Sequence, residues 1–149
     1  MGAPANGAPV PEVKSQHVSA STADAPYWRA LSEGRLTMQR CQGCSHWHWP
    51  AVSRCSECGA WDPPWQDVPI EGAVFSWATT WHPFGGTEAI GVPYTTVLVA
   101  LPHADNRRLL GLWEGEEGEL SMGAAVVGSV GATMVGKTEV PSLRWRLAR

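Results

Sequence analysis

The sequence predicts a mainly β protein with a short N-terminal helix. Three observations support this fold class: one short amphipathic segment near residue 25, two closely spaced cysteine pairs, and four to five short apolar or alternating runs after Pro69. A chain of 149 residues has room for one domain or two very small ones. The predicted divisions are a tail or linker at 1–23, the helix and cysteine segment at 24–68, and a β module at 69–149.

The composition argues against several classes of protein. The formal net charge is −3 and 17% of the residues are charged, against roughly 25% in an average globular domain. A general nucleic-acid binder needs clustered Lys and Arg, which this balance does not favour. No run approaches 18 consecutive apolar residues, so no membrane span is expected. The N-terminus lacks the pattern of a secretory signal, so the expected location is the cytoplasm.

The helix is predicted to begin at Asp24-Ala25-Pro26 and to end at Gly34, which is suited to a left-handed turn. Tyr27, Trp28 and Leu31 form its apolar stripe. A helix of about ten residues is not stable alone, so this stripe must dock on its own domain or on another chain. The two aromatic residues make these three side chains candidates for binding a partner.

The remaining elements are predicted to be strands. Leu36–Arg40 leads into the cysteines, and the alternation of Val74–Trp81 places Phe75, Trp77, Thr79 and Trp81 on one face of a strand. Further strands are expected at 94–101, 108–113, 125–135 and 143–147, with a turn at 105–106 and an acidic loop at 114–119. This spacing predicts a small antiparallel barrel or sandwich.

The cysteines carry the strongest chemical signal. Cys41 and Cys44 form one Cys-x-x-Cys pair, and Cys55 and Cys58 form a second. Two such turns facing each other supply four thiolates in a tetrahedron, a set that favours Zn or Fe. Disulfides or a redox dithiol fit this pattern less well. We expect structural zinc, with a rubredoxin-like iron site as the alternative, because four protein ligands leave no open position on the metal.

The residues around the cysteines are expected to support this site. Gly43 and Gly59 are predicted to give the turns their backbone freedom. His46 and His48 are expected to be surface or packing residues, because four thiolates already complete the coordination. Four tryptophans are expected to cover the metal turns or to pack them against the next module: Trp47, Trp49, Trp61 and Trp65.

The sequence predicts no catalytic residue. It contains no Gly-rich phosphate loop, no nucleophile elbow and no His-Glu-x-x-His motif. His82 and His103 lie near predicted turns, and no carboxylate at an informative spacing marks either as a general base. The chain therefore shows no self-contained active site.

The order of these elements resembles the zinc-ribbon/OB-fold family labelled domain of unknown function 35, over about residues 24–149. The resemblance rests on Tyr27–Leu36, Gln39-Arg40-Cys41, Pro50, Cys55, Cys58-Gly59, Gly72–Trp77 and the Tyr94–Leu101 run. It implies a rubredoxin-like zinc ribbon followed by a small OB-fold antiparallel β-barrel.

The resemblance also implies a function. Members of this family are accessory subunits that bind thiolase-fold partners acting on acyl-CoA, in lyase (aldolase) or transferase complexes such as those that shorten steroid side chains. An enoyl-CoA hydratase-like chain is a further expected partner. Contact with CoA is implied as well, with Trp77, Trp81, Arg107 and Arg108 as the ligand-binding candidates, because the acidic loop at 114–119 disfavours phosphate.

Two alternative functions follow from the same residues. In an OB-fold module for single-stranded nucleic acid, Trp77 and Trp81 would stack on bases. A rubredoxin-like electron-transfer protein would hold iron in the four-cysteine site.

Overall fold

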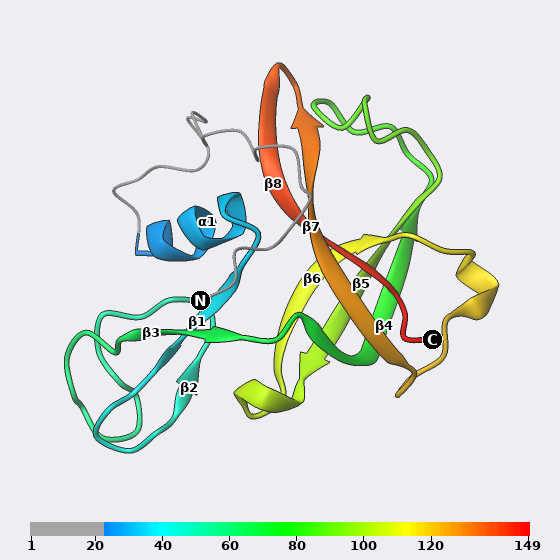
Figure 1. Cartoon of the computed structure of the whole chain (residues 1–149). Helices are drawn as coiled ribbons and strands as arrows, with labels where there is room; N and C mark the ends of the chain where they lie inside the picture. The colour runs from blue at the N-terminus through cyan, green and yellow to red at the C-terminus, as the bar shows by residue number, and fades with distance from the viewer. Residues whose placement is uncertain (1–22) are drawn as a thin grey trace.

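A computed structural model describes residues 23–149 (Figure 1). The tail or linker expected at 1–23 lies outside the described residues, apart from its last residue. In chain order the elements are α1 (Ala25–Ser32), β1 (Leu36–Arg40), β2 (Trp47–His48), β3 (Trp65–Val68), β4 (Glu71–Thr80), β5 (Tyr94–Leu101), η1 (Pro102–Ala104), β6 (Arg107–Trp113), η2 (Glu117–Glu119), β7 (Ala125–Val135) and β8 (Thr138–Leu147).

Helix α1 forms close to where the sequence places it. The Asp24 carbonyl accepts the backbone N–H of Tyr27 at 2.9 Å, and the Asp24 carboxylate accepts the indole N–H of Trp28 at 3.0 Å. Gly34 ends the helical segment at φ +76°. Tyr27 and Leu31 are buried in the core of this chain, and the helix packs on β1 and β8. Of the two docking modes expected for the stripe, the helix therefore adopts docking on its own chain.

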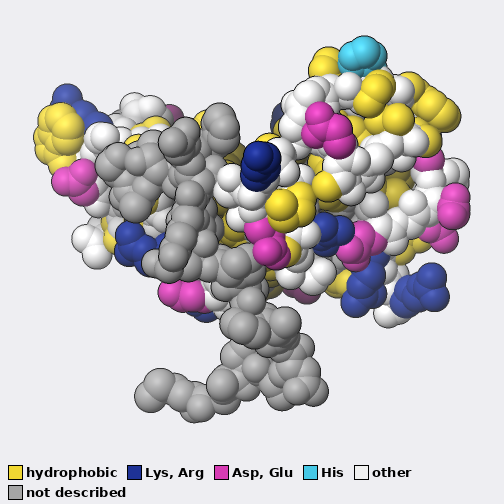
Figure 2. Space-filling model, turned by 90° about the horizontal axis from the view of Figure 1, so that it is seen from above, with side chains coloured by type: hydrophobic (Ala, Val, Ile, Leu, Met, Phe, Trp, Pro, Cys, Tyr) yellow, Lys and Arg dark blue, Asp and Glu magenta, His cyan; other side chains and the backbone are white. Residues whose placement is uncertain are grey.

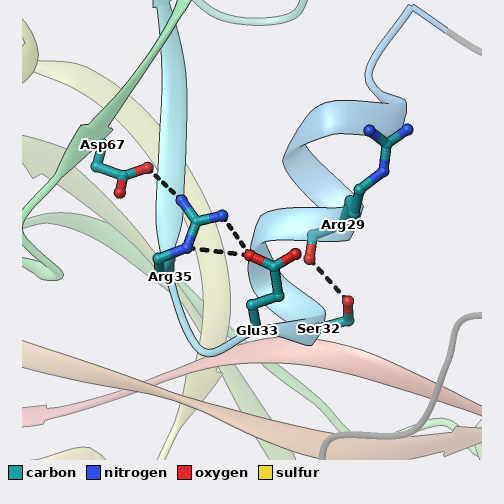
Figure 3. A network of polar contacts seen from close by, with 5 residues as sticks. All are labelled: Arg29, Ser32, Glu33, Arg35 and Asp67. Carbon is teal, nitrogen blue, oxygen red and sulfur yellow. Dashed lines mark hydrogen bonds and ion pairs between the residues drawn. The ribbon is translucent and has the colours of Figure 1, made fainter. Parts of the chain in front are cut away.

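The cysteine segment is built on a three-stranded antiparallel sheet with β1 in the middle and β2 and β3 on either side. Arg35 ties this sheet to the end of the helix, as Figure 3 shows. One guanidinium nitrogen lies 2.6 Å from Asp67 on β3, and the group also bonds the Glu33 carboxylate. All three side chains are about half exposed, so this network positions the helix more than it stabilises the fold.

The second half of the chain is a closed barrel with the strand order β4-β5-β6-β8-β7. Every neighbouring pair is antiparallel except β6 and β8, which are parallel. This arrangement is a five-stranded Greek-key barrel of the OB type. The fold class predicted from the sequence is confirmed: mainly β, one short helix, a cysteine ribbon and a small barrel.

The barrel core is centred on Trp145, which is fully buried. The indole lies between the backbones of Gly111 on β6 and Gly128 on β7, where any side chain would collide with it. Val97, Val99 and other apolar residues of β5 complete the interior. Small residues on two strands thus make room for one large side chain.

Two expectations about the strands are wrong. In β4 the pairing with β5 shifts between Val74 and Ser76, which leaves Phe75 as an extra residue. This β-bulge places Val74 and Trp77 toward the core and leaves Phe75 42% exposed, so Phe75 and Trp77 do not share a face. The last strand also begins at Thr138, five residues earlier than predicted, because it forms a long hairpin with β7.

Candidate metal centre and apolar groove

The four cysteines lie together at one end of the three-stranded sheet. Their sulfur atoms are all within 4.8 Å of one another. The Cys41–Cys58 sulfurs are 3.4 Å apart and the Cys44–Cys55 sulfurs 3.6 Å apart, far longer than a disulfide of about 2.05 Å. A regular tetrahedron with Zn–S bonds near 2.3 Å has sulfurs about 3.8 Å apart. The donor set therefore fits a single tetrahedral ion.

The two Cys-x-x-Cys turns have the same backbone structure. The Cys41 N–H donates to the His46 carbonyl at 2.9 Å, and the Cys55 N–H donates to the Ala60 carbonyl at 2.8 Å. The backbone N–H of Cys44 bonds the Cys41 sulfur and lowers the pKa of that thiol to about 7. The N–H of Cys58 likewise lowers the pKa of Cys55. Backbone N–H dipoles therefore favour the thiolate form of the first cysteine in each turn, whereas desolvation and hydrogen bonding among the sulfurs raise the pKa of Cys44 and Cys58.

Of the two glycines expected to give the turns backbone freedom, only Gly59 has a positive φ. Gly59 occupies the left-handed position of the second turn at φ +78°, but the equivalent position in the first turn is Ser45 at φ +65°. Gly43 does not have a positive φ. A Cβ at Gly43 would lie 3.2 Å from the Cys58 sulfur, so glycine serves close approach to the sulfur atoms there.

His48 is a member of the site that the sequence did not single out. It is buried on β2, and its Nε2 lies 3.3 Å from the Cys55 sulfur. When Cys55 is a thiolate, the His48 Nε2–H donates a hydrogen bond to its sulfur. This hydrogen bond disperses negative charge from the four-sulfur centre. The alternation of His46 and His48 around Trp47 was the available signal, since it places both histidines on one side of a short strand.

His46 links the ribbon to the barrel. Its ring centroid lies 4.8 Å from that of His48, and its Nε2 accepts a hydrogen bond from the Arg107 guanidinium at 3.0 Å. Arg107 is the first residue of β6. The metal turns are therefore connected to β6 of the barrel through two histidines in edge-to-face contact and one arginine.

The tryptophans of the ribbon divide by role. Trp47 is buried, and Trp49 packs against Tyr27 of the helix with ring centroids 4.5 Å apart. Trp65 packs against the core. Trp61 is 69% exposed and lies under the Arg54 guanidinium. Three of the four thus join the ribbon to the rest of the chain, and one lies on the surface.

The three helix residues expected to bind a partner line one apolar groove. Tyr27 and Leu31 are buried, while Trp28 is partly exposed. The groove has a volume of about 240 Å³ between α1 and the outer side of β6 and β8. Ile90 and Leu110 border it from the barrel. The apolar face of the helix is therefore part of the core and also forms one wall of this groove.

The four ligand-binding candidates are not brought together. Trp77 packs against the core, and Trp81 is 71% exposed beside a separate cavity of about 450 Å³. Arg107 bonds His46. Arg108 lies over the Phe75 ring, 3.7 Å from its centroid. The two arginines point to different partners because neighbouring strand residues alternate sides, so they form no common phosphate site.

His103 has a carboxylate partner that sequence spacing could not reveal. Its Nε2 lies 2.8 Å from Glu71 at the surface, 32 positions away in the chain. His82 packs against Phe84 in the loop after β4. Neither histidine lies beside a hydroxyl nucleophile among the contacts described for it. Within residues 23–149, no helix has the length and apolarity needed to cross a bilayer.

Residues 28–62 match the family described as ChsH2, rubredoxin-like zinc ribbon domain. The fold is similar to the solved structure titled Ltp2-ChsH2(DUF35) aldolase, with 26% identity, a TM-score of 0.66, and coverage of 81% of this chain and 92% of that one. It is also similar to a DUF35 protein of unknown function from Sulfolobus solfataricus, with 16% identity, a TM-score of 0.54, and coverage of 86% and 87%. No curated protein matches the chain.

The second comparison shows the fold alone, whereas the first adds likeness in sequence over most of both chains. The matched ribbon contains all four cysteines and ends just before the barrel half of the chain. The chain therefore combines a segment similar to the ChsH2 zinc ribbon with a closed β-barrel, in a fold similar to those of the two solved DUF35 structures.

Proposed function

We propose that this chain is a non-catalytic accessory subunit that binds and stabilises a thiolase-fold enzyme acting on acyl-CoA substrates. The observation that carries the proposal is the similarity, over 92% of the matched chain, to the structure titled Ltp2-ChsH2(DUF35) aldolase. That title names an aldolase that contains a ChsH2 protein together with Ltp2. The corresponding complex here would be an aldolase or acyl transferase, with steroid side-chain degradation as the proposed context.

The arrangement of the residues supports an accessory role. The metal site is built for structure, since four cysteine sulfurs leave no position for substrate. Zinc is the proposed ion, because a set of four thiolates at tetrahedral spacing suits it. Tyr27, Trp28 and Leu31 are the proposed partner-binding residues, since they line an apolar groove. Four metal-binding thiols persist best in a reducing compartment, so the cytoplasm is the proposed location.

Substrate binding is assigned to the partner. Trp77, Trp81, Arg107 and Arg108 lie in separate surroundings, so the proposal places CoA mainly on the thiolase-fold chain. An enoyl-CoA hydratase-like chain remains a proposed additional member of the complex.

The experiment is affinity purification of the tagged full-length chain from its own cells, with mass spectrometry of the retained proteins. A stoichiometric thiolase-fold protein is the expected result. Purification of the chain as a lone monomer at physiological salt and protein concentration would overturn the proposal. A second measurement is metal analysis, in which we expect about one equivalent of zinc and a colourless protein, whereas a ferric four-thiolate site would be red.

A further inference from the structure

The barrel is closed by a very short seam. Strands β6 and β8 pair only at Leu112–Arg144 and Trp113–Trp145, although β6 begins at Arg107 and β8 at Thr138. Before the seam the strands separate, with β6 paired only to β5 and β8 only to β7. The backbone of Leu143 still lies against Gly111, so the edges without a strand neighbour are those of residues 107–110 on β6 and 138–142 on β8. Figure 1 shows β8 running to the top of the molecule, and α1 packs against β8.

The two open edges are not equivalent. Strand β8 carries Pro141, which is buried and has no backbone N–H to donate. A proline at this position is a common protection against the addition of another strand. Strand β6 has no proline between Arg107 and Trp113, so every residue keeps its donor and acceptor. Its outward-facing Leu110 is 63% exposed. The β6 edge is therefore the one suited to strand addition.

The apolar groove lies directly against this edge. Its lining contains no charged side chain: Tyr27, Trp28, Leu31, Ile90, Thr96, Leu110, Gly111, Leu112, Thr133, Val135, Val140, Pro141, Ser142 and Leu143. Its volume of about 240 Å³ is below the roughly 300–1,000 Å³ of ordinary small-molecule sites. An uncharged, narrow groove beside an open strand edge fits the alternate side chains of an extended peptide better than it fits an anionic cofactor.

Further exposed apolar residues continue from this groove over the barrel. Val135 is 38% exposed at the β7–β8 hairpin, and Phe84 is 56% exposed in the loop after β4. Figure 2 shows hydrophobic side chains gathered on the barrel side of the molecule, beside a histidine. A partner surface seated there would cover these residues and bring a segment of its own chain to the β6 edge.

We propose that the thiolase-fold partner docks by adding an extended, apolar and uncharged segment to the edge of β6 over residues 107–110, with its inward side chains in the groove beside Trp28. This inference rests on the proposed function and names its binding mode. Backbone pairing along β6 supplies affinity, and the side chains entering the groove supply specificity. A second copy of this chain, or residues 1–22, would be different occupants that the experiment distinguishes.

The first test compares Leu110→Asp with Met122→Asp in the tagged full-length chain. Both residues are exposed, at 63% and 78%, but Met122 is not part of the groove lining. Leu110→Asp is expected to weaken capture of the thiolase-fold protein at least tenfold, and Met122→Asp is expected to leave it unchanged. Metal content and circular dichroism of each variant identify misfolding, and Leu110→Gln provides a variant without the added charge.

The outcomes separate the two proposals. If the wild-type chain captures no thiolase-fold protein, the proposed function fails. If the wild-type chain and Leu110→Asp capture that protein equally, the docking mode is overturned and the proposed function stands. If Leu110→Asp instead dissolves a homodimer of the isolated chain, the groove belongs to a second copy and the docking mode is again overturned.

The second test measures amide hydrogen exchange of the wild-type chain, free and with the captured partner. We expect the amides of residues 107–110 to exchange at least tenfold more slowly in the complex. Unchanged exchange there, with a complex fully formed, would show that docking uses side chains only and would overturn strand addition. If deleting residues 1–22 speeds the same exchange in the free chain, that segment is the occupant and the proposal fails.

Discussion

Trp145 fills the centre of the barrel between two glycines, which makes Gly111→Ala a direct test of how the β6–β8 seam is built. A methyl carbon on Gly111 would lie 2.6 Å from Cδ1 and Nε1 of Trp145 and 2.7 Å from the backbone carbonyl oxygen of Leu143. The indole has little room to retreat, because its opposite end lies over the backbone of Gly128, with two ring atoms 2.8 Å from where a Cβ would stand. The substitution must therefore shift β6 away from β8 or force the ring off its rotamer.

The expected loss of unfolding free energy follows from this geometry. Overpacking a core by one methyl group costs about 1–3 kcal/mol. The rigid carbonyl and the ring held on both sides place Gly111→Ala in the upper half of that range, at about 2–3 kcal/mol. For a chain of this size, a loss of this magnitude lowers the melting temperature by about 5–10 °C.

The assay is thermal unfolding followed by circular dichroism, with Gly118→Ala as the matched control. Gly118 has no atom within 4 Å of its Cβ position, so this control is expected to change the melting temperature by no more than about 1 °C. In a Trp145→Phe background the smaller ring leaves space, and Gly111→Ala is expected to cost less than half as much. A melting temperature for Gly111→Ala equal to that of the wild type would show that the β6–β8 seam has room for a side chain at position 111.

Three further predictions concern the metal centre and the helix. Cys55→Ser is expected to lower bound zinc from about one equivalent to less than half, measured by elemental analysis; full retention would contradict a four-sulfur site. His48→Ala is expected to weaken zinc binding about 10–100-fold in chelator competition, with partial rescue by His48→Gln. Equal affinity would show that the His48–Cys55 hydrogen bond does not contribute to zinc binding. Trp28→Ala is expected to weaken the partner complex by about 2 kcal/mol or more in calorimetry, and an unchanged affinity would exclude Trp28 as an anchor.

The cysteine ribbon and the barrel were predictable because their signals are local. Two Cys-x-x-Cys pairs place four sulfurs on one ion regardless of the rest of the chain, and the β-branched, apolar run at Tyr94–Leu101 marks β5 directly. Pro26 in the first turn marks the helix start and Gly34 in the left-handed conformation marks its end, whereas the Asp24 carboxylate accepts the Trp28 indole N–H and makes no side-chain cap hydrogen bond. Local sequence patterns therefore predict these features without information on which strands pair.

The remaining features depend on pairing between distant segments. The bulge at Phe75 exists only because β4 is registered against β5, and the hydrogen bond of His48 to Cys55 requires the second turn to fold over β2. Likewise, Arg107 and Arg108 resemble a phosphate site in sequence, yet tertiary contacts direct one to His46 and the other to Phe75. The groove at β6 forms where strands 25 or more positions apart diverge, which no local pattern encodes.

The contact between Arg107 and His46 limits how the two halves of this chain can be exchanged with those of relatives. The Nε atom of Arg107 is buried and its Nη2 lies 3.0 Å from Nε2 of His46, so part of the guanidinium is shielded from water at the junction. A hybrid protein that keeps this barrel but takes a ribbon without His46 would leave that charge buried with one acceptor fewer, at a cost of about 1–3 kcal/mol or more. Hybrid proteins should therefore fold when Arg107 and His46 come from the same parent, and the two residues should change together in evolution.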